Sequence, residues 1–320
     1  MSNILITSVG RRVSLVRAFK KEYFKINPKG SVYVSDFQPN LSSAAQIVDR
    51  AFKTCKIDDD NYIELLLKIC LVNNIKLIVP TIDTELTVLA KNRQEFFKKG
   101  VSIVLSDVDF IEISINKIKT KSFFDSLNVK TAQILNKNNY KLPLFIKPVF
   151  GSGGKENFII RNENQFSAYH FENDYLQFFE YLDHDIYDEY TCDLYYDQKS
   201  NLKCVIPRKR LEVRGGEVSK AITCKNDVKA FVEKKFSKID GAKGCITLQV
   251  FFNEKTATIV AIEINPRFGG GFPLSYLAGG NYPKWIIEEY LLNQEIEYFD
   301  EWENNLLMLR YDDEILIHND

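Results

Sequence analysis

Short apolar runs alternate with amphipathic stretches over the first third of the chain. The apolar runs predict buried strands at 3–7, 32–34, 77–79 and 101–105. The stretches between them have helical periodicity, most clearly over 62–72, where apolar residues recur on one face. Strands that alternate with helices predict a parallel sheet with both faces covered. Because such sheets bind ligands beyond the carboxyl ends of their strands, we expect function at that edge.

The pattern changes after residue 113. A basic helix is predicted over 117–127, and a short strand over 144–148 is followed by a glycine-rich turn. From residue 183 on, longer strands dominate, with clear examples at 190–196, 203–208, 244–252 and 258–265. Length alone suggests roughly two domains. The order of elements instead predicts three blocks, which are 1–113, 114–182 and 183–320.

Composition narrows the class of protein. Lys and Arg number 42 and Asp and Glu number 43, so the formal net charge is −1, and neither a nucleic acid nor a membrane is expected as a partner. The six cysteines include no C-x-x-C pair, which predicts reduced, buried thiols. No apolar run is long enough to span a bilayer, and the first residues lack the pattern of a signal peptide. We expect a globular, cytoplasmic protein.

Two strands near the C-terminal end carry polar side chains on one face. Alternation along 258–265 turns Glu263 and Asn265 to one side and their apolar neighbours into the core. We expect Gln249 on the facing strand to lie opposite Ala261, as a diagonal neighbour of Glu263. A carboxylate and two amides supply the oxygen ligands that Mg²⁺ prefers. The alternative is a solvated polar face of a hairpin, and the pattern alone leaves both open.

Positive groups follow this hairpin and precede the glycine-rich turn. Arg267 stands just before three consecutive glycines. It can stabilise charge on a phosphoryl group in transfer, or hold a carboxylate. Lys147 ends a strand and can reach a phosphate as a point charge. Backbone N–H groups of the turn at 151–154 can cradle phosphate oxygens, although the turn lacks the P-loop pattern. Glycine turns with solvated side chains are the alternative for both segments.

Further polar residues follow the strands of the first block. Arg11 and Arg12 stand at a strand–helix junction, where a helix N-terminus and two arginines suit an anion, and only one glycine precedes them, so there is no dinucleotide fingerprint. Asp83 and Glu85 open the helix after the third strand. They either line the substrate side of a cleft or merely complement the helix dipole. In the last block, Arg208 and Arg210 begin a basic run that either holds a substrate anion or faces solvent.

The order of these motifs resembles the ATP-grasp superfamily. It is carried along nearly the whole chain by Lys117, Lys147-Pro148, the glycine-rich turn, 178–182, 189–191, Gln249 and the run Glu263-Ile264-Asn265-Pro266-Arg267. The likeness is strongest to the nucleotide-binding halves of the carbamoyl-phosphate synthetase large subunit, and the Glu-x-Asn-Pro-Arg run is its specific part. The resemblance implies an α/β protein in which a Rossmann-like parallel sheet precedes a two-part α+β ATP-grasp fold.

The resemblance also implies a role for each position. The ATP phosphates would contact Lys117 and Lys147, under a flap formed by Gly151, Ser152, Gly153 and Gly154. The adenosine would lie beside Glu180, Leu182 and Glu189. The metal, Mg²⁺ with Mn²⁺ as a substitute, would be held by Gln249, Glu263 and Asn265. Arg267 and Lys147 would act on the phosphoryl group. Two features depart from the family: the interval from Glu180 to Glu189 is long, and Gln249 replaces an acid of many relatives.

The implied reaction joins a small-molecule carboxylate to an amine at the expense of ATP. Phosphorylation turns the carboxylate into an acyl phosphate, and attack by the amine then gives an amide, so the protein mainly positions groups and neutralises charge. The substrates would bind to Arg11, Asp83, Glu85, Arg208 and Arg210. A homodimer is compatible with this picture.

Two other interpretations differ from this one in class. A non-catalytic nucleotide-binding module of the same fold should have lost at least one of the four residues Lys147, Glu263, Asn265 and Arg267, and all four are present. A nicotinamide enzyme would have to bind its cofactor with Gly10 alone.

Overall fold

The first hundred residues form the predicted parallel sheet. The computed structural model describes residues 2–150 and 156–318. The sheet has the order β3-β2-β1-β4-β5, and neighbouring strands run parallel. Its strands are β1 (Asn3–Ile6), β2 (Val32–Asp36), β3 (Ala51–Lys53), β4 (Ile75–Val79) and β5 (Ser102–Ile103). The strand expected at 101–105 is therefore shorter than predicted.

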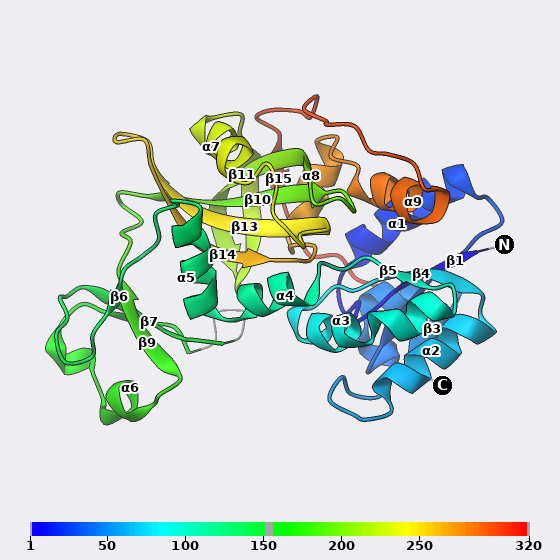
Figure 1. Cartoon of the computed structure of the whole chain (residues 1–320), viewed down its shortest axis with the longest axis horizontal. Coiled ribbons are helices and arrows are strands. Elements are labelled where there is room, and N and C mark those ends of the chain that lie inside the picture. The colour runs from blue at the N-terminus through cyan, green and yellow to red at the C-terminus, as the bar shows by residue number, and fades with distance from the viewer. Residues whose placement is uncertain (1, 151–155, 319–320) are drawn as a thin grey trace.

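Helices cover both faces of this sheet, as expected for apolar strands (Figure 1). One face packs against α1 (Val13–Ile26), which buries the stripe Leu15, Val16 and Phe19. The other face packs against α2 (Tyr62–Val72) and α3 (Asp83–Lys98). Short 3₁₀ turns at Pro39–Leu41 and Ser43–Ile47 lead into β3.

A small antiparallel sheet forms a separate lobe, at the lower left of Figure 1. Its order is β6-β9-β7-β8, with β6 (Ile134–Leu135), β7 (Leu144–Pro148), β8 (Phe158–Ile160) and β9 (Leu176–Glu180). A 3₁₀ turn at Glu163–Gln165 and helix α6 (Ala168–Glu172) complete this lobe. Helices α4 (Val108–Ile115) and α5 (Lys117–Ser126) connect it to the parallel sheet.

The last block is built on a larger sheet with the order β14-β13-β10-β11-β12-β15. The strands are β10 (Asp188–Tyr196), β11 (Leu202–Arg214), β12 (Glu217–Thr223), β13 (Gly244–Asn253), β14 (Thr258–Asn265) and β15 (Leu307–Leu309). Its helices are α7 (Asp227–Lys235), α8 (Phe272–Leu277) and α9 (Tyr282–Leu292). The three sheets fall within 1–113, 114–182 and 183–320, and the boundaries themselves stay a prediction.

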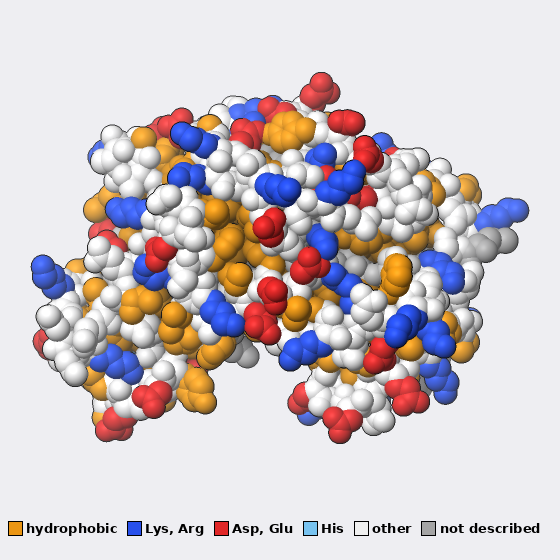
Figure 2. All heavy atoms as spheres, viewed as in Figure 1, with side chains coloured by type: hydrophobic (Ala, Val, Ile, Leu, Met, Phe, Trp, Pro, Cys, Tyr) orange, Lys and Arg blue, Asp and Glu red, His pale blue; other side chains and the backbone are white. Residues whose placement is uncertain are grey.

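The last block shares a hydrophobic core with the first. Helix α9 packs against α1 and β4, and α8 also packs against α1. The ring of Phe268 meets that of Phe19 edge-on, with centroids 5.9 Å apart. This shared core fixes the segment after β14 against the N-terminal sheet. Figure 2 shows the molecular surface hollowed between the small-sheet lobe and the N-terminal lobe.

None of the described helices is both long and apolar enough to cross a lipid bilayer.

Candidate active site

The hairpin of β13 and β14 brings the three predicted metal-binding residues together. Gln249 pairs directly with Glu263, and Asn265 Nδ2 donates a hydrogen bond of 3.1 Å to Glu263 Oε1. The expected register was wrong, because Gln249 does not lie opposite Ala261. From Phe252 to Val250 the pairing is already one residue away from the expected register, and an irregularity between Gln249 and Val250 shifts it by one more residue, as a β-bulge does. Together the two shifts place Gln249 directly opposite Glu263 instead of diagonally.

The chemistry of this donor set fits Mg²⁺. One carboxylate and two amide groups lie on one face, and Mg²⁺ is commonly held by one or two carboxylates together with water and substrate phosphates. Within residues 2–150 and 156–318, no three Asp, Glu, His or Cys side chains gather as a self-sufficient metal cage. The arrangement therefore suits a metal ion that arrives with a nucleotide.

Two lysines from other elements lie near Glu263. Lys117 is the first residue of α5, and its N–H donates to the carbonyl of Val149, at 3.0 Å. Burial lowers the pKa of Lys117, while Glu263 and Asp83 raise it. Burial lowers the pKa of Lys147 to about 8, with Glu263 opposing this effect and Lys117 adding to it. The structure thus brings both predicted phosphate-binding lysines to the metal-binding face.

The four flap residues predicted from the sequence, Gly151, Ser152, Gly153 and Gly154, lie outside the described residues. Lys147 is the penultimate residue of β7, and its ammonium group lies 4.7 Å from the centroid of the Phe179 ring on β9. The described part of this lobe therefore places Lys147 next to the segment that leads to Glu180.

The residues predicted for adenosine lie along β9 and the start of β10. Glu180 ends β9, where its Oε2 accepts a hydrogen bond of 3.2 Å from the N–H of Gln133. Leu182 is buried just beyond it. Glu189 lies on β10, where burial raises its pKa and the adjacent Arg210 lowers it. Their role in nucleotide binding stays a prediction.

Arg210 forms an ion pair with Glu189. It was predicted to bind the acceptor, whereas the structure places it beside a residue that was predicted for ribose. Both side chains are largely buried. Arg210 is therefore positioned to set the charge and orientation of Glu189, and the expected contact with an acceptor loses its support.

Arg267 connects this face to the N-terminal sheet. Its Nη2 lies 2.9 Å from Asp83 Oδ2, at the first turn of α3. The residue at the N-cap of α3 is Ile82, which makes no side-chain capping bond. Asp83 therefore pairs with an arginine of the candidate site. The interpretation of Asp83 as a helix-capping residue does not account for this ion pair.

Two predicted substrate residues are instead buried in the protein, and these predictions were wrong. Glu85 is fully buried, where it accepts hydrogen bonds from Thr7 Oγ1 at 2.9 Å and from the hydroxyl of Tyr62. Arg208 is also fully buried, with Nε and Nη2 at 2.8 and 3.1 Å from the two carboxylate oxygens of Asp193. Neither side chain can meet a ligand in solution without a rearrangement of the core.

Three charged residues outside the predicted set of site residues join the acceptor side. Arg12 Nη1 donates to the carbonyl of Phe268 at 3.1 Å. Glu217, the first residue of β12, lies 3.1 Å from Arg11 and 3.0 Å from Arg310. The doubled arginine at 11–12 was a visible signal for Arg12. Glu217 lies within the basic run that begins at Arg208, whereas Arg310 stands outside every motif.

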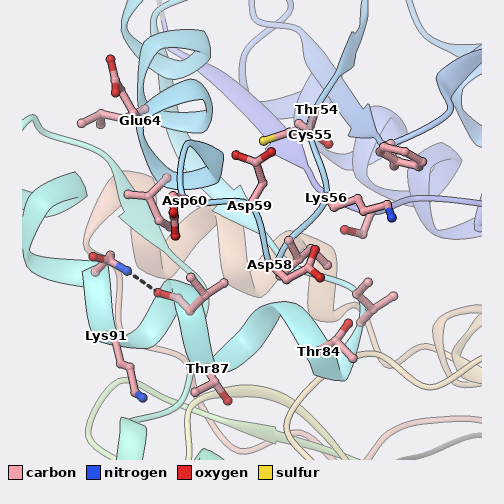
Figure 3. A pocket seen from close by; sticks show the side chains of 18 of the residues that line it. Thr54, Cys55, Lys56, Asp58, Asp59, Asp60, Glu64, Thr84, Thr87 and Lys91 are labelled. Atoms are coloured by element: carbon pink, nitrogen blue, oxygen red, sulfur yellow. Dashed lines mark hydrogen bonds between the residues drawn. The ribbon is translucent and has the colours of Figure 1, made fainter.

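A groove of about 1210 Å³ opens on the N-terminal lobe. Figure 3 shows it between α2, α3 and the segment at 54–60, with acidic side chains Asp58, Asp59, Asp60 and Glu64 along one side. Ile82 and Thr84, which flank Asp83, line its edge. The groove is thus a neighbour of the candidate active site and contains none of the residues predicted for it.

Two family models match the chain. One, described as "PylC-like, N-terminal domain", matches residues 4–104. The other, described as "ATP-grasp in the biosynthetic pathway with Ter operon", matches residues 175–313, which include Glu263, Asn265 and Arg267. The chain contains an ATP-grasp domain. The predicted superfamily and fold class are confirmed, and the match supports the predicted ATP-grasp ligase. Lys117 and Lys147 lie between the two matched segments.

Solved structures show the same ATP-grasp fold. The biotin carboxylase domain of Hydrogenobacter thermophilus 2-oxoglutarate carboxylase, in complex with MgADP and bicarbonate, is 15% identical, with a TM-score of 0.71 over 95% of this chain and 73% of that one. An L-amino acid ligase from Bacillus licheniformis is 15% identical, with a TM-score of 0.66 over 91% and 74%.

A larger enzyme also contains the fold. Rhizobium etli pyruvate carboxylase is 14% identical, with a TM-score of 0.65 over 88% of this chain. The ATP-grasp protein spans only 27% of that chain, so the likeness concerns one part of the larger enzyme. No curated protein matches the sequence significantly.

Proposed function

We propose that this ATP-grasp protein is a Mg²⁺-dependent ligase that phosphorylates a small-molecule carboxylate with ATP and joins it to an amine. The observation that carries the proposal is the facing pair of Gln249 and Glu263, with Asn265 bonded to Glu263. Lys117 and Lys147 lie near the same carboxylate. Two cations beside a metal-binding carboxylate suit a triphosphate and its metal ion.

The reaction has two steps whose bonds balance. A carboxylate oxygen of the substrate attacks the γ-phosphorus, so that an O–P bond forms and the bond to ADP breaks. The amine nitrogen then attacks the acyl carbon, a C–N bond forms, and phosphate leaves with the electrons of the broken C–O bond. The proton lost by the amine passes to the phosphate or to solvent.

The chain's own residues would bind and neutralise charge in these steps. Lys117 and Lys147 would hold phosphate oxygens, and Arg267, fixed by Asp83, would lie against the carboxylate and the phosphoryl group as negative charge moves between them. Gln249, Glu263 and Asn265 would hold Mg²⁺, which neutralises phosphate charge when bound, and we propose that Mn²⁺ can substitute for it. The six cysteines are all unpaired, which suits a reducing compartment, and we propose a cytoplasmic location.

A trapping experiment tests the proposal without knowledge of the natural amine. Hydroxylamine replaces the amine and converts an acyl phosphate into a hydroxamate. We expect ADP and hydroxamate to appear together, only with ATP, Mg²⁺ and an accepted carboxylate. Glu263→Gln should lower turnover at least about a hundredfold. The matched control is Glu254→Gln, in the exposed turn of the same hairpin, which should behave as wild type.

The outcome that contradicts the proposal is nucleotide binding with no ADP release for any carboxylate. That result would favour the non-catalytic module of the same fold. Wild-type turnover by Glu263→Gln would instead remove the metal assignment.

A further inference from the structure

Four arginine side chains from three distant segments gather around the glycines that follow β14. They are Arg11, Arg12, Arg267 and Arg310. Among residues 2–150 and 156–318, the carboxylates paired with this group are Asp83 and Glu217. Four guanidinium groups against two carboxylates leave a net charge of +2, since 4 − 2 = 2. Neutral or cationic molecules would not be attracted to such a surface, whereas anions would.

The two arginines nearest the reacting groups already have partners within the protein. Arg267 is paired one to one with Asp83. Arg12 is held by the carbonyl of Phe268, and its burial together with the charge of Arg267 lowers its pKa to about 10. These two side chains are fixed in place and define the inner end of the group.

The outer end is a shared carboxylate. Glu217 Oε1 lies 3.1 Å from Arg11 Nη2, and Glu217 Oε2 lies 3.0 Å from Arg310 Nη1. One carboxylate thus serves two guanidinium groups, each of which can bind a carboxylate or phosphate with two parallel hydrogen bonds. The exposed fractions of Arg11, Glu217 and Arg310 are 71%, 38% and 28%, so an anion from solvent can reach them.

Glycine at position 270 keeps this outer end open. A Cβ atom there would lie 3.1 Å from Cδ of Glu217, so a side chain would crowd the shared carboxylate. Its carbonyl accepts a hydrogen bond from Arg310 Nη2. The loop after Arg267 is therefore hydrogen-bonded directly to Arg310. A ligand bound by Arg11 and Arg310 at the outer end would extend toward Arg267.

Asp83 acts on charged groups of both the phosphate side and the arginine group. Burial lowers the pKa of Lys117, and Glu263 and Asp83 are the charges that raise it. The charges that act on the pKa of Arg12 are Arg267, Glu217 and Asp83. Asp83, the ion-pair partner of Arg267, is therefore common to both sets.

We propose that the carboxylate substrate carries a second anionic group, a carboxylate or a phosphate, which Arg11 and Arg310 hold while the reacting carboxylate meets Arg267. This inference rests on the proposed function and adds the substrate class to it. Arg11 and Arg310 would exchange their shared partner Glu217, in part, for the ligand's oxygens. Monoanionic acids of equal length would lack this anchor.

Matched acids test the inference in the hydroxylamine assay. The acids with two anionic groups, called dianions below, are succinate, glutarate, adipate and phosphoglycolate, and the monoanions are butyrate, pentanoate, hexanoate and glycolate. We expect kcat/KM to be about tenfold to a hundredfold higher for the best dianion than for its matched monoanion. Success of a dicarboxylate or of phosphoglycolate tells which anion is preferred.

Variants assign the effect to the residues. Arg310→Gln should raise KM for that dianion about tenfold or more and leave KM for ATP within about twofold. The control is Arg214→Gln, which removes an exposed ion pair with Asp312 and should leave both KM values unchanged. Equal kcat/KM for dianion and monoanion, or an Arg310→Gln variant equal to wild type, overturns the inference while hydroxamate formation still supports the ligase.

Direct binding separates the two proposals when no acid is turned over. In that case calorimetric titration of the same eight acids into the protein is the measurement. Tighter binding of a dianion that weakens in Arg310→Gln supports the second-anion site, although the ligase proposal fails. Binding of dianions that is equal in both proteins, or absent, overturns the inference.

Discussion

Arg267 Nη2 and Asp83 Oδ2 lie 2.9 Å apart, although 184 residues separate them in the chain. The pair joins the segment after β14 to the first turn of α3, and both side chains are mostly buried. A partly buried, charge-assisted bond of this kind fixes the direction of a guanidinium group. The N-terminal sheet therefore contributes to the candidate active site by orienting Arg267.

Loss of this orientation should affect the chemical step more than nucleotide binding. Asp83→Asn keeps the shape of the side chain and removes its charge. We expect kcat to fall about tenfold or more, with KM for ATP and the melting temperature nearly unchanged. Asp109→Asn, in the exposed first turn of α4, is the matched control. A variant at position 83 with wild-type kcat would show that the pair only holds the lobes together.

Lys147 should make nucleotide affinity depend on pH. Burial lowers its pKa to about 8 in the free protein, so the ammonium group loses its proton as pH rises through that value. Phosphate oxygens favour the charged form, and binding should therefore take up a proton near pH 8. We expect the Kd for a non-hydrolysable ATP analogue to rise above this pH, and Lys147→Arg to remove the rise. A Kd that does not change with pH in either the wild type or the variant would contradict the account.

The alternation of polar and apolar residues was sufficient to predict the metal-binding face. It was insufficient to predict the register between β13 and β14. Glu263 and Asn265 alternate with Ile262 and Ile264, so their shared face could be predicted. The irregularity beside Gln249 leaves no trace in such a pattern, because the strand remains apolar on both sides of it.

Long-range pairs explain the other errors. Arg208 was taken as part of a basic, accessible run, but Asp193 on the neighbouring strand β10 draws it into the core. Glu85 looked like a helix-opening acid, yet Thr7 and Tyr62 bind it inside the N-terminal lobe. Arg310 stands outside every motif, and only the folded chain brings it to Glu217.

The Asp193–Arg208 pair should matter for stability. Arg208 donates two bonds to the carboxylate, and Ser275 Oγ donates a third at 2.6 Å. Asp193→Asn leaves a buried guanidinium group without its counter-charge, and we expect a loss of about 3–5 kcal/mol in the free energy of unfolding. Lys209→Gln, which breaks a partly exposed pair with Asp188, should cost about 1 kcal/mol or less. Urea denaturation measures both, and equal losses would contradict the assignment.

Glu85 should make stability fall as pH rises. Burial raises its pKa above the unfolded value, and the bonds from Tyr62 and Thr7 only partly oppose this. The folded protein therefore keeps a proton that the unfolded chain releases. This contribution is complete below the unfolded pKa and is lost as pH rises through the folded one.

Glu85→Gln should remove this part of the pH dependence. The free energy of unfolding of the variant should then decline less than that of wild type as pH rises above the unfolded pKa of a glutamate. KM for the carboxylate should stay unchanged, since Glu85 is fully buried. A raised KM with unaltered stability would instead return Glu85 to the substrate cleft.

The most direct test of the ligase account follows an oxygen atom. The carboxylate that supports hydroxamate formation is prepared with a heavy oxygen isotope in its carboxyl group, and the phosphate released with the natural amine or with hydroxylamine is analysed by mass spectrometry. Formation of an acyl phosphate at the site of Lys147, Glu263 and Arg267 predicts transfer of one labelled oxygen to phosphate in each turnover. Release of phosphate without label, at the rate of ADP formation, would show that the carboxylate is not phosphorylated and would contradict the account.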